Sequence, residues 1–334
     1  MVEYRTMSEQ AHLHASLLRL GGRLPDAALA TARLTLAETG TAALPDPDTL
    51  LEIGFTFVPA LPDQRTFGRN VPPLLDLVGR DLGDEIDNAA VRTAAELPEA
   101  VALWRAVRLA PEWAAATIPP TRVYVLEANG PQAETTATMM RALTAAGQQW
   151  PLVEVYRSGE QLPPYARQAR NSGALLWVED EAPPLRIARV FDVVDADGAR
   201  FLPDHERLTG ADLEQVAAYL DAGAPVLATT ARLRDEVEPE RGEVVPMTYR
   251  TDGRWLWTDA VLYYLLTYGF APEPELLARA RAAGALLPAP DPADEHRALA
   301  LLFQSAALSP VPDEATSGAA TSSPAPSTGA TEAG

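Results

Sequence analysis

The residues whose types and spacing could best do chemistry lie in one segment near the C-terminal end of the chain. Residues 250–257 read RTDGRWLW, and a pair of tyrosines follows shortly afterwards. A Thr-Asp-Gly sequence between two apolar runs predicts a hairpin turn. On the strand after this turn, Trp255 and Trp257 share one face, because side chains alternate along a strand. Aromatic rings gathered with an arginine are typical of surfaces that recognise another protein.

The same segment also has a purely structural interpretation. A helix predicted over residues 258–268 must bury its apolar residues, and the nearest surface is the strand that carries the two indoles. In that case both tryptophans are core residues, and Arg250 forms an ion pair with Asp252 that braces the turn. We expect the indoles in the core and Arg250 on a surface that recognises a partner. The candidate binding residues are Arg250, Asp252, Trp255, Trp257 and Tyr264.

Other residues that carry chemistry are few. The four histidines are His12, His14, His205 and His296, and none has the spacing of a metal-binding pair. Three aspartates between residues 192 and 197 resemble half of a calcium loop, but Ala199 and Arg200 stand where a further ligand and a glycine belong. The chain has neither a Gly-x-Ser-x-Gly elbow nor a Gly-x-Gly-x-x-Gly nucleotide loop. The sequence therefore predicts no catalytic residue, no cofactor site and no metal site.

Two residue types are missing from the chain. It has no cysteine, which excludes disulfides, thiolate metal sites and thiol nucleophiles. All 27 basic residues are arginines, so Schiff-base chemistry and a phosphate-loop lysine are excluded as well. The absence of lysine has two explanations: a GC-rich genome, or selection against lysine modification.

The charge balance restricts the partners. The formal net charge is −19, from 46 acidic and 27 basic residues, and the excess of acid is spread along the chain. An acidic surface repels phosphate groups, so nucleic acids and anionic membranes are excluded, whereas a basic protein partner is permitted. Apolar runs are too short for a membrane span, and the first residues lack the apolar core of a secretory signal. We therefore expect a cytoplasmic protein, whose oligomeric state is left open.

The elements that must position these residues fall into four regions. Residues 1–118 are expected to be mostly helical, with one short strand at 53–58 and helices at 8–20, 25–40, 74–97 and 99–109. Residues 121–182 alternate between strand and helix, which predicts a small, partly parallel sheet. Its expected strands are 122–127, 152–156 and 174–178, and its helices 132–146 and 160–171.

The remaining sequence is a mixed β/α module followed by a tail. Residues 183–308 are expected to hold two hairpins, around residues 195–198 and 251–253, and a strand at 226–230. The expected helices are 210–220, 258–268, 273–283 and 293–307. Residues 309–334 are rich in Ser, Thr, Ala, Gly and Pro and are expected to be disordered. The predicted fold class is α/β (α+β): a helical N-terminal region, then a mixed-sheet α/β domain with a C-terminal hairpin-helix module.

Part of this module is similar to a known group of sequences. Residues 199–283 resemble a module of uncharacterised actinobacterial proteins with the pattern R-T-D-G-x-W-x-W, then Y-Y-L. The matching segments are residues 226–232, 244–246, 250–265 and 271–276. The resemblance implies lineage and a shared domain, and by association an accessory or immunity-type binding protein.

Two functions are consistent with these observations. The first is a non-enzymatic protein-binding protein, immunity-like, regulatory or accessory, which fits the lack of catalytic motifs, the acidic surface and the aromatic module. The second is a small-molecule-binding α/β enzyme that uses the strand ends around residues 127–131 and 157–180, where such sheets place their ligands. A deep pocket with arginines and acids at those strand ends would favour the enzyme, and an exposed aromatic surface would favour the binding protein.

Overall fold

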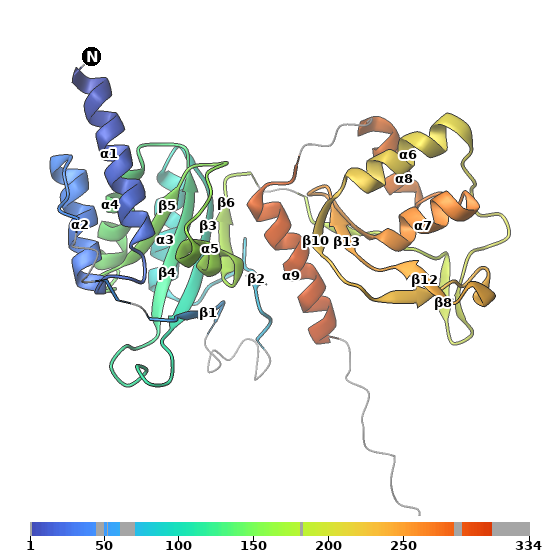
Figure 1. Cartoon of the computed structure of the whole chain (residues 1–334), viewed down its shortest axis with the longest axis horizontal. Helices are drawn as coiled ribbons and strands as arrows, with labels where there is room; N and C mark the ends of the chain where they lie inside the picture. The colour runs from blue at the N-terminus through green and yellow to red at the C-terminus, as the bar shows by residue number, and fades with distance from the viewer. Residues whose placement is uncertain are drawn as a thin grey trace, which may run out of the picture.

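A six-stranded sheet forms the centre of the first lobe (residues 2–180), with strand β3 (Ala100–Leu109) in its middle (Figure 1). The strand order is β2-β6-β3-β4-β5, and β1 also pairs with β3. Strand β3 is antiparallel to its neighbours, whereas β4–β5 and β2–β6 are parallel pairs. The other strands are β1 (Thr56–Val58), β2 (Leu75–Asp76), β4 (Thr121–Ala128), β5 (Leu152–Tyr156) and β6 (Ala174–Val178). This is a computed structural model, and it describes residues 2–44, 50–51, 53–60, 71–180, 183–283 and 289–308.

Helices cover both faces of this sheet, so that the first lobe has three layers. Helices α2 (Asp26–Thr39), α3 (Glu85–Glu96) and α4 (Gln132–Ala145) share one core with Leu103, Tyr124 and Leu126. Helix α5 (Pro164–Asn171) and the end of α1 (Val2–Arg19) share the opposite core with Trp104 and Val125. The central strand is therefore buried on both faces.

Two side chains protect the edge of the sheet at β5. A sheet edge presents unpaired backbone groups, which invite pairing with another chain. Here Arg33 on α2 donates to the carbonyl oxygen of Val153 at 2.9 Å, and His14 on α1 contacts that of Val155 at 2.8 Å. Burial lowers the pKa of His14, so that the neutral ring donates this hydrogen bond. Both helices thereby close the edge with side chains instead of a further strand.

The helix predicted over residues 99–109 is wrong, because this segment is strand β3. Arg105 and Arg108 are three residues apart, which imitates the polar face of a helix. In the strand these two side chains point to opposite faces of the sheet, and both are buried. Arg105 pairs with Asp87 at 3.1 Å and Arg108 with Asp26 at 2.7 Å. The spacing of Arg105 and Arg108 suggested the exposed face of a helix, but both arginines are buried and paired with carboxylates from distant helices.

The second lobe (residues 183–283) packs three helices on a four-stranded sheet of order β10-β13-β14-β7. Its strands are β7 (Arg186–Ile187), β10 (Ala224–Leu227), β13 (Tyr249–Thr251) and β14 (Trp255–Thr258). Its helices are α6 (Gly210–Ala222), α7 (Asp259–Tyr268) and α8 (Pro274–Ala283). Two further hairpins are β8–β9 (Val193–Asp195, Gly198–Arg200) and β11–β12 (Arg232–Arg234, Glu243–Pro246). The hairpins around residues 195–198 and 251–253 are confirmed.

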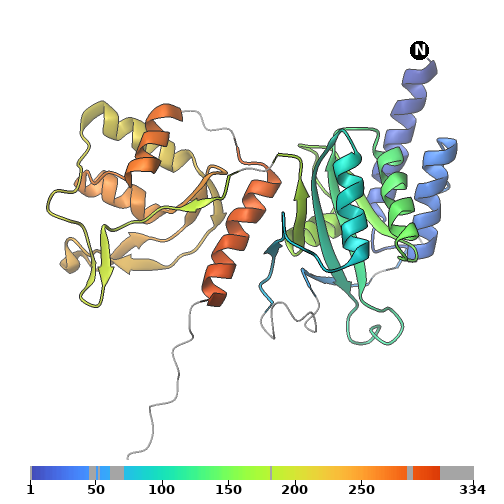
Figure 2. The same ribbon diagram turned by 180° about the vertical axis from the view of Figure 1, so that it is seen from behind.

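Helix α9 (Pro292–Leu308) follows the second lobe in sequence but packs between the two lobes (Figures 1 and 2). On the first lobe, buried His296 contacts the carbonyl oxygen of Leu75 at 2.9 Å, and its ring meets the edge of Trp104. On the second lobe, the Asp294 carboxylate lies directly against the turn between β13 and β14. A Cβ added at Gly253 would come within 2.4 Å of that carboxylate. Helix α9 thus holds the lobes together.

The predicted α/β fold class is confirmed, with its N-terminal helices and its mixed sheets. The boundary expected between residues 118 and 121 lies inside one sheet, in the connection between the paired strands β3 and β4. The tail at residues 309–334 lies outside the described residues. Among the residues that are described, no helix combines the length and the apolar character needed to cross a membrane.

The contact between α9 and the second lobe is expected to depend on pH. Burial and the nearby charge of Asp291 raise the pKa of Asp294 to about 6, against attraction from Arg254 and Arg297; Asp252 adds to the rise. The ionised form is thus disfavoured in the folded protein. The resulting loss of stability grows as the pH rises from about 4 to about 6 and stays constant above that. Asp294→Asn should raise the free energy of unfolding by about 1 kcal/mol at pH 7, after allowance for solvent screening.

Denaturant melts between pH 3 and pH 8 measure this difference. It should shrink as the pH falls below 6 and approach zero near pH 3, because the Asp294 carboxyl group is then mostly protonated in the unfolded state as well as in the folded state. Asp204→Asn, at an exposed position, serves as the control and should show no such pH dependence. Equal stability of Asp294→Asn and wild type at pH 7 would contradict the assignment.

Candidate functional site

Both tryptophans of the RTDGRWLW segment are buried, as the structural interpretation predicted. Trp255 is 5% exposed and Trp257 is fully buried between the sheet and the helices of the second lobe. The indole of Trp257 stacks on Tyr219 at a ring distance of 5.9 Å, and its N–H donates to the carbonyl oxygen of Leu220 at 3.2 Å. A Cβ added at Gly223 would lie 2.2 Å from the indole, so only glycine lets the chain pass there. Neither indole can reach a partner while the lobe is folded.

Arg250 does not pair with Asp252, and the expected ion pair is wrong. Its Nε donates to Asp259 at 2.6 Å, and its NH1 donates to the carbonyl oxygens of Asp221 and Gly223 at 2.7 and 3.1 Å. These contacts join the C-terminal end of α6 to the first turn of α7. Arg250 is therefore a brace between two helices, with 21% of its side chain exposed.

The carboxylate of Asp252 accepts hydrogen bonds within the turn that begins at this residue. Its Oδ1 accepts from the backbone N–H groups of Arg254 and Trp255 at 2.9 and 2.7 Å. Its Oδ2 accepts from the Tyr219 hydroxyl at 2.5 Å and from Arg279. Burial acts to raise the pKa of Asp252, but these hydrogen bonds hold it below its usual value. The ionised carboxylate is thus part of the core and has no free side for a partner.

Tyr264 is the last of the five candidate residues, and it too is buried. It is 2% exposed, and its ring packs against Phe191 and Phe201 in an aromatic cluster beneath α7. Its hydroxyl oxygen accepts from the backbone N–H of Glu236 at 3.1 Å. Burial raises the pKa of this tyrosine to about 12. The structure therefore brings all five residues into one lobe, where each has a structural partner.

At the strand ends around residues 127–131, the structure describes a small cavity. Its volume is about 240 Å³, and it lies between the start of β3 and the start of α4. The lining residues that the structure describes include Glu99 and Glu134 but no arginine. A Cβ added at Gly130 would lie 2.2 Å from the Glu99 carboxylate, so this loop is closely packed. The described part of the chain also has no cluster of three histidine or acidic side chains that could hold a metal ion.

The opposite end of the same sheet exposes two tryptophans, which sequence reasoning missed. Trp113 is 75% exposed in the loop between β3 and β4, and Trp150 is 52% exposed in the loop before β5. Both loops lead into the N-terminal ends of neighbouring parallel strands, because Val123 of β4 pairs with Leu152 of β5. Figure 1 shows the β3–β4 loop projecting from this end of the lobe. Large exposed aromatic side chains are uncommon on a surface without a partner.

The loop that carries Trp113 is ordered by its own hydrogen bonds. Backbone N–H groups of Ala114, Thr117 and Ile118 donate to carbonyl oxygens three or four residues earlier in the loop. The Thr117 hydroxyl donates to the carbonyl oxygen of Ala114 at 3.0 Å, and Ala114 itself is buried. Trp113 is thus displayed on a compact turn, and fixing it on a partner costs little conformational entropy.

Trp150 adopts an unfavourable backbone conformation. Its φ is +46°, and no other non-glycine residue in the described ranges has a positive φ. This region is uncommon for a bulky side chain, and the following Pro151 restricts it further. Strained residues of this kind occur chiefly at functional sites, where the surrounding structure holds them in place.

The two tryptophan loops are also depleted of charge. Across the chain 22% of the residues are charged, yet residues 110–120 hold only Glu112 and residues 142–153 hold none. Few charges together with exposed tryptophan distinguish the centre of a protein interface from ordinary surface. This charge depletion is the signal by which sequence reasoning could have found the site. We call this end of the first lobe, with Trp113 and Trp150, the tryptophan surface.

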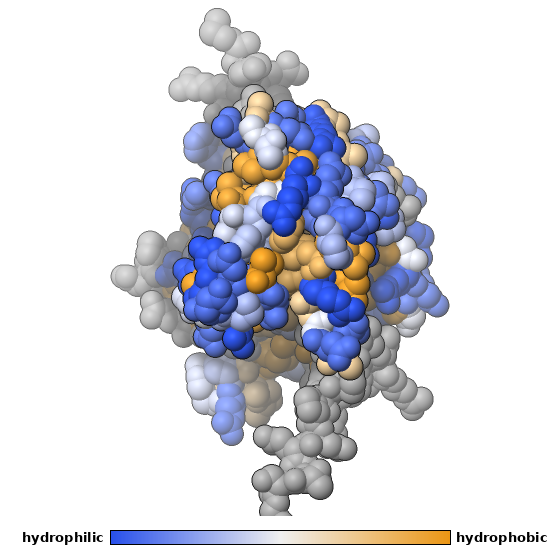
Figure 3. All heavy atoms as spheres, turned by 90° about the vertical axis from the view of Figure 1, so that its right-hand side faces the viewer, coloured by the Kyte–Doolittle hydropathy of each residue, from blue (hydrophilic) through white to orange (hydrophobic). Residues whose placement is uncertain are grey.

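The outer face of the second lobe also shows apolar residues, but they are mixed with hydrophilic ones (Figure 3). Val194 is 74% exposed, in a hairpin in which Asp195 and Arg200 form an ion pair at 2.8 Å. Leu233 is 49% exposed, between two arginines of β11. Single exposed aliphatic side chains among charges are normal on a soluble protein. This face is therefore a weaker candidate than the tryptophan surface.

Substitutions should separate the core role of Trp257 from the bracing role of Arg250. Trp257→Ala should lower the free energy of unfolding by about 3–5 kcal/mol, because it leaves a cavity in the second lobe. Arg250→Ala should lower it by about 1–2 kcal/mol, because Asp259 and two carbonyl groups lose a partly buried partner. Leu266→Ala, at a position that is 59% exposed, is the control and should change it by less than about 0.5 kcal/mol.

Urea melts of the purified variants measure these values. Wild-type stability of Arg250→Ala would show that the brace is dispensable and would return Arg250 to the recognition surface.

Comparison of the chain with protein families, with curated proteins and with solved structures found no match. The resemblance of residues 199–283 to actinobacterial proteins therefore stays a prediction. The candidate site is accordingly argued from the geometry of this chain alone.

Proposed function

We propose that this chain is a non-enzymatic binding protein whose ligand is another protein, and that the partner docks on the tryptophan surface. The observation that carries the proposal is the exposure of Trp113 and Trp150 at one end of one sheet, on loops that hold a single charge. A small number of buried tryptophans typically supplies most of the binding free energy of an interface. Both loops are anchored to the sheet, so the partner would meet a largely preformed surface.

The expected partner is complementary in shape and in charge. It needs apolar pockets that accept two indoles, with a rim able to hydrogen-bond the exposed polar groups of the loops. A net charge of −19 attracts a basic partner from a distance and repels acidic competitors. This agrees with the accessory or immunity-type role that the resemblance implies. The cytoplasmic location expected from the sequence belongs to the same proposal, and cell fractionation checks it.

The enzyme hypothesis receives less support. It depends on the strand ends around residues 127–131 and 157–180. The cavity described at residues 127–131 is small, and its acids are accompanied by no arginine. A larger cavity at the start of α5 has two arginines but no acid among its described lining residues. The buried acids at these strand ends also have partners: Glu127 accepts a hydrogen bond from the Tyr156 hydroxyl at 2.7 Å. A groove with a free nucleophile and a base would have favoured catalysis.

Substitution of the two tryptophans tests the proposal. Full-length protein is immobilised, and captured proteins are compared quantitatively between wild type and the double variant Trp113→Ala/Trp150→Ala. The proteins lost with the double variant are then purified and titrated by calorimetry. Each single substitution should weaken binding by about 2 kcal/mol, because an anchoring indole is removed, while the melting temperature stays within about 2 °C.

The matched control is Leu266→Ala on the second lobe, which should keep wild-type affinity. A partner that binds the double variant as tightly as wild type would refute the assignment of this surface.

Trp150→Gly gives a second test that separates function from stability. Glycine adopts positive φ without strain, so this variant should be at least as stable as wild type although it loses a large side chain. Its partner affinity should fall by the same factor as for Trp150→Ala. Denaturant melts check the first expectation, and a marked loss of stability would show that the indole is there to pack.

A further inference from the structure

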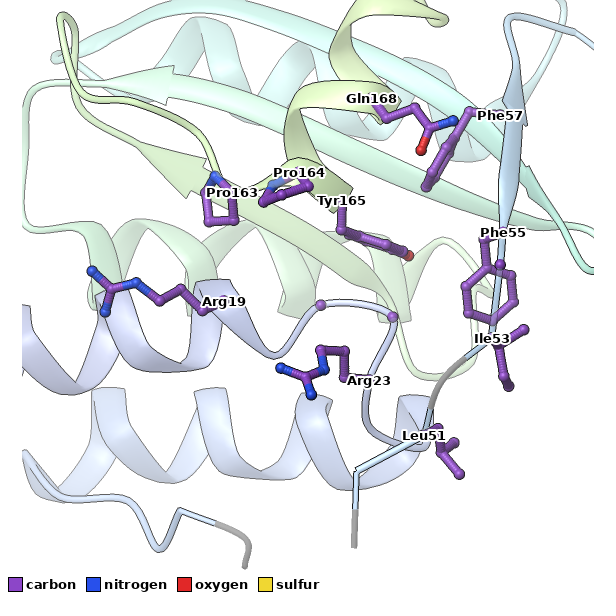
Figure 4. A pocket seen from close by; sticks show the side chains of 13 residues that line it. Arg19, Arg23, Leu51, Ile53, Phe55, Phe57, Pro163, Pro164, Tyr165 and Gln168 are labelled. Carbon is purple, nitrogen blue, oxygen red and sulfur yellow. The ribbon is translucent and has the colours of Figure 1, made fainter. Parts of the chain in front are cut away.

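A second, separate feature of the first lobe is a cavity of about 640 Å³ between the end of α1 and the start of α5. Figure 4 shows Arg19 and Arg23 on the α1 side of this cavity, Tyr165 on the α5 side, and Phe55 and Ile53 together at one end. The volume lies within the range of sites for small organic molecules. The cavity shares no lining residue with the tryptophan surface, and the proposed function makes no use of it.

The walls of the cavity are mainly apolar, and its charged groups are of one sign. Leu51, Ile53, Phe55, Phe57, Pro163, Pro164 and Tyr165 supply the apolar lining. Arg19 and Arg23 are its only charged lining residues within the described ranges, although acids outnumber arginines by 46 to 27 in the whole chain. Neither side chain forms an ion pair with a described residue, whereas the buried arginines nearby do. The cavity is thus a locally positive site on an acidic protein.

The charges behind the cavity cancel one another. Arg108 is paired with Asp26 at 2.7 Å, and Arg33 with Glu154 at 2.5 Å. Arg108, Asp26 and Glu154 lie near Tyr165. Two positive and two negative side chains leave no net charge in this layer. The two arginines at the rim therefore determine the electrostatic character of the cavity.

Helix α5 adds to the positive character. Pro163, Pro164 and Tyr165 line the cavity and form the start of this helix. Its N-terminus has no side-chain cap and no acidic residue in its first turn. The N-terminal end of a helix carries partial positive charge, which favours an anion nearby. This effect acts together with the guanidinium groups and would not define a site without them.

The aromatic wall is fixed in position. The Tyr165 ring lies so close to the turn after α1 that a Cβ at Gly22 would approach it to 2.5 Å. Phe57 meets the other side of the ring at a centroid distance of 5.1 Å, and the Arg108 guanidinium lies over Phe55 at 4.4 Å. A flat apolar group entering the cavity would meet a preformed surface and would not need to rearrange it.

We infer that this cavity binds an organic anion whose apolar body packs against Phe55 and Tyr165 and whose acidic group pairs with Arg19 and Arg23. A carboxylate and a phosphate both match the guanidinium geometry, so the shared chemistry is a planar or tetrahedral oxyanion on an apolar group. A neutral apolar molecule would contact only the apolar walls of the cavity, and inorganic phosphate would contact only the two arginines.

Fluorescent probes test this assignment on the full-length protein. The anionic probe is 8-anilinonaphthalene-1-sulfonate, and the neutral probe is N-phenyl-1-naphthylamine, which has the same aromatic body without the sulfonate. Wild type should bind one anionic molecule, and Arg19→Gln/Arg23→Gln should bind it about tenfold more weakly, a loss expected for charge-assisted contacts. The same variant should bind the neutral probe as wild type does. Competition by octanoate and by octyl phosphate distinguishes the two oxyanions.

Two further variants keep the test decisive. Arg157→Gln/Arg167→Gln removes two exposed arginines of the same lobe that do not line the cavity, and it should bind the anionic probe like wild type. Gly54 lines the cavity, and an added Cβ there meets no atom within 4 Å, so Gly54→Trp should obstruct binding without disturbing the fold. If both double variants bind the anionic probe equally weakly, the loss reflects the overall charge of the protein and not the cavity, which would overturn the inference. If Gly54→Trp binds both probes as tightly as wild type does, the probes bind outside this cavity, which would also overturn the inference.

Discussion

The first lobe depends on the burial of two arginines in its central strand. Arg105 and Arg108 leave opposite faces of β3, and both are almost fully buried. An unpaired buried charge costs several kcal/mol, so the strand is stable only when Asp87 from α3 and Asp26 from α2 are in place. The Tyr124 hydroxyl also donates to Asp87, which ties β4 to the same cluster. Sheet and helices must therefore assemble together, and residues 2–180 form one unit.

The second lobe uses one carboxylate in a similar way. Asp252 accepts hydrogen bonds from the turn between β13 and β14, from Tyr219 on α6 and from Arg279 on α8. The motif that looked most like a binding site is thus the point at which a turn and two helices are joined. The same turn meets α9 at Gly253, and α9 in turn contacts the first lobe through His296 and Arg297. The turn at residues 251–254, which belongs to the motif singled out in the sequence, therefore acts in folding.

Two places on the first lobe differ from this paired interior. The charge-poor loops expose the indoles of Trp113 and Trp150, and the cavity holds Arg19 and Arg23, which form no ion pair with a described residue. The first suits a macromolecular partner, because the indoles are displayed on projecting loops. The second suits a small amphipathic anion, because it is concave. A binding protein with two such sites could bring a protein and a small molecule together on one lobe.

The sequence by itself determined most of the elements of this protein, because local signals define them. Gly40 ends α2 in the left-handed conformation, Thr-Asp-Gly forms its hairpin, and the strands over residues 122–178 follow their β-branched and aromatic runs. It also predicted that Trp255 and Trp257 are core residues, since a helix beside their strand had to bury its apolar face. Only the tertiary structure decided that residues 100–109 are a strand, because the partners that neutralise its arginines come from distant helices. It alone decided that Arg250 braces two helices, and which tryptophans face solvent, because exposure depends on what packs over a side chain and not on its neighbours in sequence.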